Sequence, residues 1–575
     1  MSGSALILKA LGERIARPPR ALRNRLLAHR ARLGGRPVIA ERLPEPVLIG
    51  DADQGTALLA GRWRALGHQL TIAPGSIWQV PLPDPRLEAE RQACLWLDDL
   101  AALGSRAART LAQAWVQDWI RRYGSGRGPG WEPEVAGRRV KRWTTHAALL
   151  TGGLDRVGAD RFWRSLAMHQ RYLDRLWPQA PEGLPRLRAL AGLVWSGVVL
   201  PNDEHRLAID DLGLLAEELV DPDGGTPSRA PEDLAEILIL LIWTARVLEN
   251  AGQHAAPAHL AAIVRAVTVI RPLRLGDGSL ARFNDGGAGS ADRLDQALAE
   301  LRLGVQAKPR LSMGYARLTG GRLVLVMDGA EPPAAAATRA HAGTLAFELS
   351  SGRQPLIVNA GPGSAFGGDW ALMARQTSAP STVEIDGRSS ARIETRGLAA
   401  ATFGARLCDG PTLVSVRQAQ DASGQWLLAK HDGYVASHGL LHERRLFVDS
   451  RGQEVRGEEI LTVADARARA QFDRVAEDGR VAFAARFHLH PAVHAELDPA
   501  RQLVMLSLPS GEAWMFRVAG GLLDLEDAAW FDRAATAPAA AMQMVVRGEV
   551  VEYLGQVIWS LGRTADPPGA GPGSP

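Results

Sequence analysis

The sequence has 575 residues, which at about 150 residues per domain gives two to four domains and excludes small disulfide scaffolds. Its 66 basic and 63 acidic side chains leave a net charge of +3, which argues against a dedicated nucleic-acid-binding protein. The two cysteines, Cys94 and Cys408, lie far apart and match no metal or redox spacing.

Residues 1–40 form a basic N-terminal arm, with nine Lys or Arg in the first 36 residues against one acid, Glu13. Apolar residues alternate with Arg at roughly helical spacing over residues 9–36. The arm is therefore expected either to contact an anionic membrane face or to lie, solvated, on its own protein. It lacks the apolar stretch and cleavage site of a secretory signal, and the longest apolar run, 237–243, is too short to cross a bilayer. These features predict a cytoplasmic protein or a peripheral protein of the inner membrane.

Residues 41–311 show helical periodicity with few strand-like alternations. Ser105 is a suitable N-cap for a helix that runs towards Tyr123. Pro231, followed by two acids, is typical of a helix start, because proline needs no donor there and acids favour the positive end of the helix dipole. The following residues, 234–250, are apolar nearly all round, which predicts a buried helix.

At Ser312 the hydrophobic period changes from 3.6 to 2, which predicts a β domain over residues 312–563. The pair Gly320-Gly321 indicates a hairpin turn between strands at 315–318 and 322–327. Further strands without intervening helices are expected at 412–417, 444–448, 481–490, 503–508 and 550–561. This pattern favours an antiparallel sandwich, and the Pro/Gly-rich residues 564–575 are expected to form a disordered tail.

Seven of the fourteen histidines fall in the β part, at 341, 431, 438, 442, 488, 490 and 494. In a strand, His488 and His490 point to the same face as Arg486. Such a face suits an anionic ligand, although edge histidines that make ordinary hydrogen bonds would give the same pattern. No close Cys/His set has zinc-site spacing.

Several motifs resemble, in the same order, those of the heparinase II/III-like family. The hallmark stretch is 341–352 (HAGTLAFELSSG) with 356–361 (LIVNAG), and it is followed by HDGY, HERR, VRGE and RFHLHP at 431, 442, 455 and 486. Upstream, WEP, DGG and GDGS at 131, 223 and 276 also match. The resemblance covers roughly residues 75 to 560.

The resemblance implies an incomplete α/α toroid of helical hairpins followed by an antiparallel β-sandwich. It also implies cleavage of uronate-containing glycans by β-elimination. In that reaction the substrate carboxylate must be neutralised before a base can remove the neighbouring C5 proton, and an acid protonates the departing oxygen. An acidic polysaccharide is then the expected partner, and the family usually acts in the periplasm or outside the cell.

Several positions depart from the family pattern. Where the lyases often have His-Ala-His, this chain has Arg339-Ala340-His341, and where they have Ser-Pro-x-Tyr-His it has residues 230–234, with Asp233 at the tyrosine position. Asn359 and Pro380 stand at positions that hold metal in metal-binding members. No cofactor is therefore expected, and structural zinc or calcium is not predicted.

Two functional hypotheses follow. In the first, the chain is a lyase in which Tyr434, His431 and His341 supply the catalytic groups. Arg229 would then be the carboxylate partner, and Arg445, His488 and His490 would also bind substrate. Arg445 would in addition lower the pKa of Tyr434. In the second, the site has decayed and the chain is a glycan-binding or envelope-associated protein on the same scaffold. Structural roles remain the alternative for each of these residues.

Overall fold

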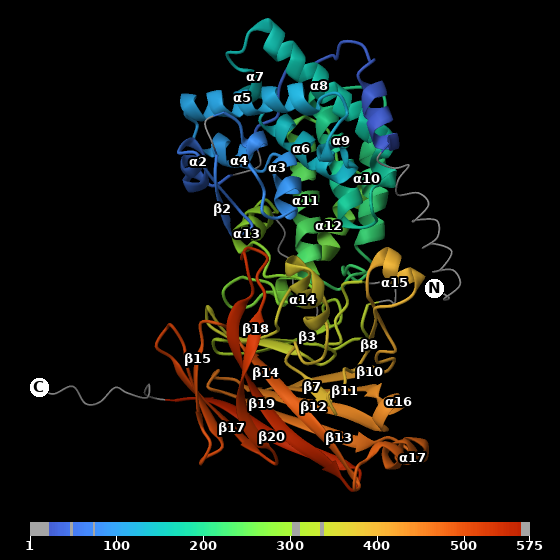
Figure 1. Ribbon diagram of the computed structural model, residues 1–575, viewed down its shortest axis with the longest axis vertical. Helices are drawn as coiled ribbons and strands as arrows, with labels where there is room; N and C mark the ends of the chain where they lie inside the picture. The colour runs from blue at the N-terminus through green and yellow to red at the C-terminus, as the bar shows by residue number, and fades with distance from the viewer. Residues whose placement is uncertain (1–21, 47–49, 73–74, 302–310, 334–337, 565–575) are drawn as a thin grey trace, which may run out of the picture.

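The structure is a computed structural model that describes residues 22–46, 50–72, 75–301, 311–333 and 338–564. Figure 1 shows two halves stacked along the long axis, one helical and one built of antiparallel strands. This arrangement confirms the expected α/α toroid followed by a β-sandwich. Of the predicted basic arm, residues 22–40 are described and 22–31 form a helix, whereas residues 1–21 and most of the predicted tail lie outside the described residues.

In the described part of the helical half, that helix is followed by α2 (Ala52–Leu59), α3 (Arg86–Gln92), α4 (Trp96–Ala102), α5 (Arg106–Tyr123), α6 (Pro133–Thr145), α7 (Ala147–Thr151), α8 (Arg156–Leu176), α9 (Leu184–Val199), α10 (His205–Leu219), α11 (Pro231–Asn250), α12 (Pro257–Ile270) and α13 (Ala291–Ala299). A short hairpin, β1 (Arg62–Ala65) and β2 (His68–Thr71), interrupts them. Among the described residues, no helix is long and apolar enough to span a membrane.

Two predicted helix starts are confirmed. The Ser105 hydroxyl accepts a hydrogen bond from the Ala108 main chain at the start of α5, which satisfies a donor that the first helical turn leaves unpaired. Helix α11 begins at Pro231 and buries most of its length, as its apolar surface predicts.

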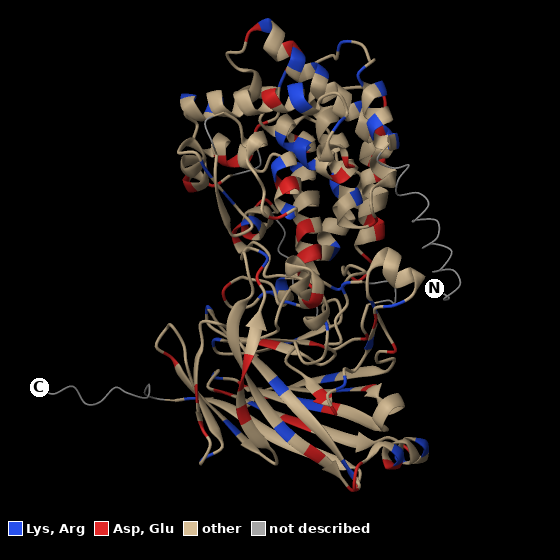
Figure 2. Ribbon diagram, viewed as in Figure 1, with Lys and Arg blue, Asp and Glu red and all other residues tan. Residues whose placement is uncertain are grey.

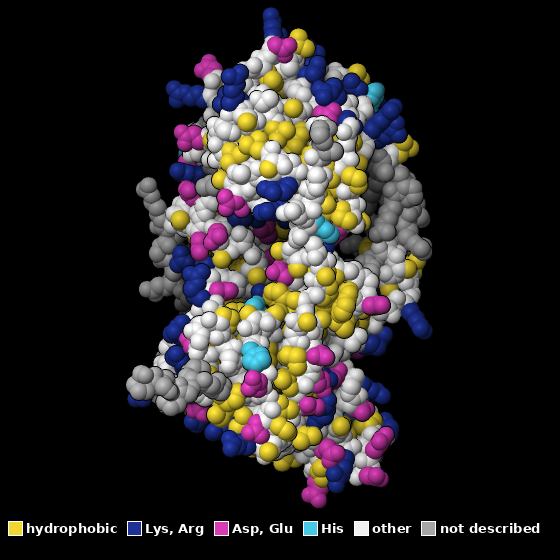
Figure 3. Space-filling model, turned by 60° about the vertical axis from the view of Figure 1, so that its left-hand side comes forward, with side chains coloured by type: hydrophobic (Ala, Val, Ile, Leu, Met, Phe, Trp, Pro, Cys, Tyr) yellow, Lys and Arg dark blue, Asp and Glu magenta, His cyan; other side chains and the backbone are white. Residues whose placement is uncertain are grey.

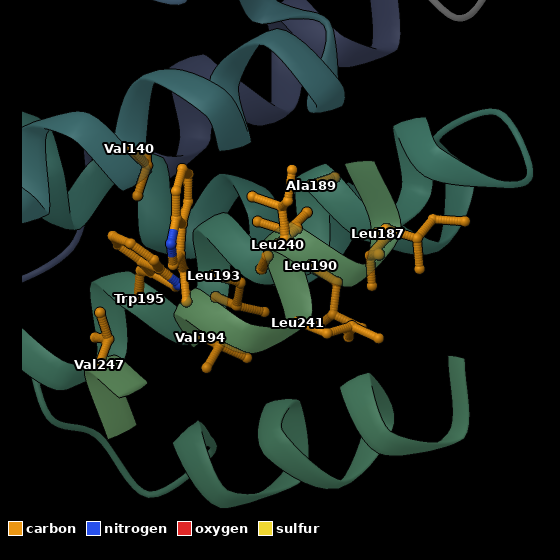
Figure 4. Packing of buried hydrophobic residues seen from close by; sticks show 14 of the residues in the cluster. Val140, Leu187, Ala189, Leu190, Leu193, Val194, Trp195, Leu240, Leu241 and Val247 are labelled. Atoms are coloured by element: carbon orange, nitrogen blue, oxygen red, sulfur yellow. The ribbon is translucent and has the colours of Figure 1, made fainter. Parts of the chain in front are cut away.

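The core of the helical half forms where α6, α9 and α11 meet, and Figure 4 shows their Leu, Val and Trp side chains in contact. Two glycines bring α6 and α9 close together. A Cβ added at Gly192 would lie 2.5 Å from the Gly137 Cα, so a larger residue at either position would force the helices apart.

Among its described residues, the β half contains eighteen strands: β3 (Tyr315–Gly320), β4 (Leu323–Asp328), β5 (Phe347–Ser351), β6 (Gln354–Val358), β7 (Val383–Ile385), β8 (Arg392–Glu394), β9 (Arg406–Cys408), β10 (Val414–Gln420), β11 (Gly424–Tyr434), β12 (Leu440–Asp449), β13 (Glu454–Val463), β14 (Arg480–Leu489), β15 (His494–Asp498), β16 (Leu503–Ser507), β17 (Ala513–Ala519), β18 (Leu522–Trp530), β19 (Ala539–Val551) and β20 (Leu554–Arg563). Helices also occur here, contrary to expectation: α14 (Gly368–Met373), α15 (Leu398–Phe403), α16 (Val435–His438) and α17 (Ala466–Val475).

Antiparallel pairing arranges most of these strands in two runs. One run follows the order β10-β11-β12-β13-β20-β17-β16-β15, and the other follows β18-β19-β14-β6-β5-β4-β3, with β7 also paired to β14. The predicted hairpin is confirmed as β3–β4, where Gly321 adopts a φ of 50° that favours glycine. The prediction of a single strand at 550–561 is wrong, because Glu552 and Tyr553 form a tight turn between β19 and β20.

Candidate functional site

Charged side chains from both halves meet at the first turn of α11. The Arg339 Nη1, from the loop before β5, donates to both carboxylate oxygens of Asp233 at 3.0 and 2.9 Å. Arg533, beyond β18, donates through Nε to Glu232 at 3.1 Å. Asp233 stands at the tyrosine position of the lyase pattern and Arg339 stands at a histidine position. These two residues therefore form an ion pair across the junction of the two halves.

Asp285 is the buried centre of this junction, with a side chain that is only 3% exposed. It accepts hydrogen bonds from the Ser364 hydroxyl and from Arg339 Nε, and its other neighbour is Arg533 at 3.5 Å. A carboxylate this deeply buried needs cationic or hydrogen-bonding partners, and Ser364, Arg339 and Arg533 supply them. We refer to Glu232, Asp233, Asp285, Arg339 and Arg533 as the junction network.

His341 lies beside the junction network. Its main-chain N–H donates to Asn284 at 3.3 Å, while its side-chain Nε2 is buried without a hydrogen-bond partner. Burial lowers the pKa of His341 to about 4, so the imidazole is neutral at pH 7. Of the predicted catalytic residues, His341 is therefore the one that the structure places near the junction.

Arg229 also lies at the junction, where each of its three guanidinium nitrogens has a hydrogen-bond partner. It pairs with Asp328, and it donates to the main-chain oxygens of Met313 and Glu331 at 3.2 and 2.6 Å. Its guanidinium carbon lies 4.8 Å from the centre of the Tyr315 ring. These contacts occupy all three guanidinium nitrogens with partners from the β half, so Arg229 joins the two halves in this structure.

Tyr434 and His431 lie inside the β half, not at the junction. Tyr434 is fully buried and donates to the Val383 main chain at 2.7 Å, and burial raises its pKa, opposite to the predicted direction. His431 contacts His442 at 3.2 Å, and both belong to a buried network with Glu459 and Arg444. The rings of His431 and Tyr434 are 5.8 Å apart, but neither side chain reaches the molecular surface.

Arg445 and Tyr434 lie on different sides of the sheet, because successive side chains of β12 point to opposite faces. Arg444 points into the core, so its neighbour Arg445 points outwards, where it is 51% exposed and pairs with Glu443 and Glu458. The structure does not bring this cation to the tyrosine.

His488 and His490 do not form a shared polar face with Arg486. His488 is buried and its Nε2 contacts the Ser378 main-chain oxygen at 3.0 Å. Strand β14 ends at Leu489, so His490 falls in the following turn, where it lies edge-on to the Trp530 ring at 5.2 Å. Arg486 instead pairs with Glu384 and Glu526.

The residues at the family's metal positions do not fit a metal ion. The Asn359 amide donates to the Arg282 main chain at 3.1 Å and accepts from Ser381 at 3.0 Å, so both of its polar atoms are engaged. Pro380 has no donor atom to offer a metal. Within the described ranges, no group of three His, Cys, Asp or Glu side chains has metal-binding geometry.

Buried neutral histidines predict a loss of stability in acid. Burial lowers the pKa of His259, His341 and His488 to about 4, against about 6.5 in an unfolded chain. As the pH falls from 6.5 towards 4, the unfolded state binds protons that the folded state does not. Each of these histidines is then expected to lower the free energy of unfolding at pH 5 by about 2 kcal/mol. Urea unfolding at pH 7.5 and 5.0 measures the difference in unfolding free energy between the two pH values. His488→Gln is expected to reduce that difference. An unfolding free energy that does not change with pH would contradict the prediction.

Asp233 and Arg339 each depart from the family pattern, but their pairing was not predicted from the sequence. The available signal was that both positions had lost the family residue and gained opposite charges. Glu232 was predicted only as an acid at a helix start, and Asp285 and Arg533 were not predicted at all. The last two come from distant segments, and no local pattern marks them.

A helical toroid joined to an antiparallel β-sandwich is the architecture of the solved lyases that this chain resembles. The chain matches heparinase III with a TM-score of 0.67 at 12% identity, over 97% of this chain and 92% of that one. It matches a heparan sulfate lyase HepC mutant from Pedobacter heparinus with a TM-score of 0.56 at 14% identity, over 98% and 91%.

Sequence comparison places the chain within a family. Residues 304–560 match the model of the heparinase II/III-like C-terminal domain. The FtsZ-localized protein C of Caulobacter vibrioides (strain NA1000 / CB15N) is 31% identical over 530 residues, covering 90% of this chain and 88% of that protein. This chain belongs to the heparinase II/III-like family.

Proposed function

We propose that this chain is a non-catalytic member of the family, a binding protein of the cell-division apparatus that retains the lyase scaffold without elimination activity. The observation that carries the proposal is the ion pair between Asp233 and Arg339, which occupies the positions of the lyase tyrosine and histidine. The name of the relative with 31% identity supports the association with cell division.

The chemistry of β-elimination supports this choice. A sugar C–H becomes acidic enough only when positive or hydrogen-bonding groups stabilise charge on the uronate carboxyl group. At the junction, Asp233 adds a negative charge at the position of the lyase tyrosine, and Arg339 is neutralised by Asp233 and Asp285. Tyr434 offers no substitute base, since its hydroxyl is buried and already donates to Val383.

The proposed location is the cytoplasmic side of the inner membrane, where the basic arm would supply a peripheral contact. FtsZ assemblies are the proposed partner, by analogy with the relative named above. The contrasting hypothesis is the lyase, which would require an acidic polysaccharide as substrate.

The test combines an absorbance assay for unsaturated uronate with sedimentation of the purified chain alongside FtsZ polymers. We expect no product from heparan sulfate, alginate or hyaluronan, under conditions in which heparinase III is active, and co-sedimentation with FtsZ. Product that disappears in His341→Ala would overturn the non-catalytic assignment. Failure to sediment with FtsZ would overturn the proposed partner.

A further inference from the structure

A small cavity inside the helical half has a strongly basic lining. Its volume is about 80 Å³, and Glu236 is the one acid among the described residues that line it. The basic lining residues come from α6, α9 and α13: Arg138, Lys141, Arg142, Arg188 and Arg293. Figure 2 shows blue ribbon segments, which mark Lys and Arg, in the middle of the helical half, and Figure 3 shows Lys and Arg around a hollow on one of its faces.

Each lining arginine is held in place by a carboxylate, which fixes the direction of the remaining donors. The contacts are 2.7 to 3.1 Å long and join Arg138 to Glu90, Arg142 to Asp98, Arg188 to Glu134, and Arg293 to Glu236. Arg188 also lies 3.6 Å from Glu236. Because one arginine has five N–H donors, these carboxylates leave some of them for another acceptor.

Lys141 differs from these arginines. In the part of the chain that the structure describes, no carboxylate lies within ion-pair distance of it. Its Nζ lies instead 5.5 and 5.6 Å from the ring centres of Trp243 and Trp195. Burial, and then repulsion from Arg142 and Arg293, lower the pKa of Lys141 well below its usual value. Trp243 also lines the cavity, is 4% exposed, and its indole N–H has no acceptor.

We propose that this cavity binds a phosphate group, either as inorganic phosphate or as the phosphoryl group of a small molecule. Donors from four helices, α6, α9, α11 and α13, surround the volume, which suits a tetrahedral oxyanion better than a planar carboxylate. The volume corresponds to a few water molecules, so it admits a phosphate and excludes a sugar chain. A bound anion would favour the charged form of Lys141 and accept a hydrogen bond from the Trp243 indole N–H.

This site is distinct from the junction network. Glu236, Leu240 and Trp243 follow Asp233 on successive turns of α11, so the cavity lies further along that helix, inside the helical half. The proposal does not depend on whether the chain is catalytic, because none of its lining residues belongs to the junction network.

Isothermal titration of the full chain with inorganic phosphate, at constant ionic strength, tests the proposal. We expect saturable binding of one phosphate per chain and at least tenfold weaker binding in Lys141→Met. Lys430→Met is the matched control, since Lys430 is an exposed lysine on β11. Arg293→Met, at a half-exposed position on the cavity wall, is a second variant that is expected to fold and to weaken binding.

Titrations with a nucleoside monophosphate and with glucuronate distinguish the sources of the anion. Tighter binding of the nucleoside monophosphate than of inorganic phosphate would assign the site to a phosphorylated small molecule, and the reverse order would assign it to free phosphate. Absence of saturable phosphate binding, equal binding by Lys141→Met and Lys430→Met, or preference for glucuronate would each overturn the proposal.

Discussion

Replacing Arg444 by methionine is expected to lower the free energy of unfolding by about 3–5 kcal/mol. Arg444 is fully buried, and its guanidinium donates to Glu459 at 2.8 Å and to the main chains of Leu345 and Ser381. Without it, the buried Glu459 carboxylate loses its nearest full positive charge and keeps only His442 and Trp559 as partners. Urea unfolding of the variant measures the loss.

The adjacent Arg445→Met variant is the matched control. Arg445 forms its ion pairs on the exposed face of the sheet, so its replacement is expected to cost no more than about 1 kcal/mol. Adding Glu459→Gln to Arg444→Met is expected to restore part of the stability, because the uncompensated charge is then gone. Similar losses in Arg444→Met and Arg445→Met would contradict the burial-based explanation.

Local patterns predicted much of the fold. Ser105 marks a helix start because its side chain accepts a hydrogen bond from the first turn, and Pro231 marks one because it has no N–H that needs an acceptor there. Gly320-Gly321 marks a hairpin within four residues. The error at 550–561 has the same origin. Glu552 and Tyr553 are not among the residue types that usually form turns. Both nevertheless adopt positive φ angles, because tertiary contacts of β19 and β20 fix the register of these two strands.

The candidate site was harder to predict, because its geometry depends on contacts between residues far apart in the chain. Strand alternation correctly separates Arg444 from Arg445, but no pattern in the sequence shows which face of β12 is the core. The same limit applies to Tyr434, whose burial follows from α16 and the strands around it. Resemblance to the family identified His341 and the changes at Asp233 and Arg339, whereas their arrangement required the three-dimensional structure.

Replacing Arg229 by methionine is expected to destabilise the protein by about 3 kcal/mol at pH 7. Arg229 is 12% exposed and pairs with Asp328, which is also buried, so the variant leaves a carboxylate without its cation. The backbone φ of Arg229 is 50°, a strained value for any residue other than glycine. Methionine has the same strain, so the comparison isolates the guanidinium.

The pH dependence of this variant separates charge from packing. Burial raises the pKa of Asp328 even though Arg229 acts in the opposite direction, so removal of Arg229 raises it further. A protonated Asp328 no longer needs a cation, and the stability difference between wild type and Arg229→Met is expected to shrink as the pH falls from 7 towards 4. In the Arg229→Met/Asp328→Asn double variant, the loss at pH 7 is expected to be smaller than in the single variant. A difference that stays constant with pH, in calorimetric unfolding of both proteins, would mean that Arg229 stabilises the junction through packing and its main-chain hydrogen bonds alone.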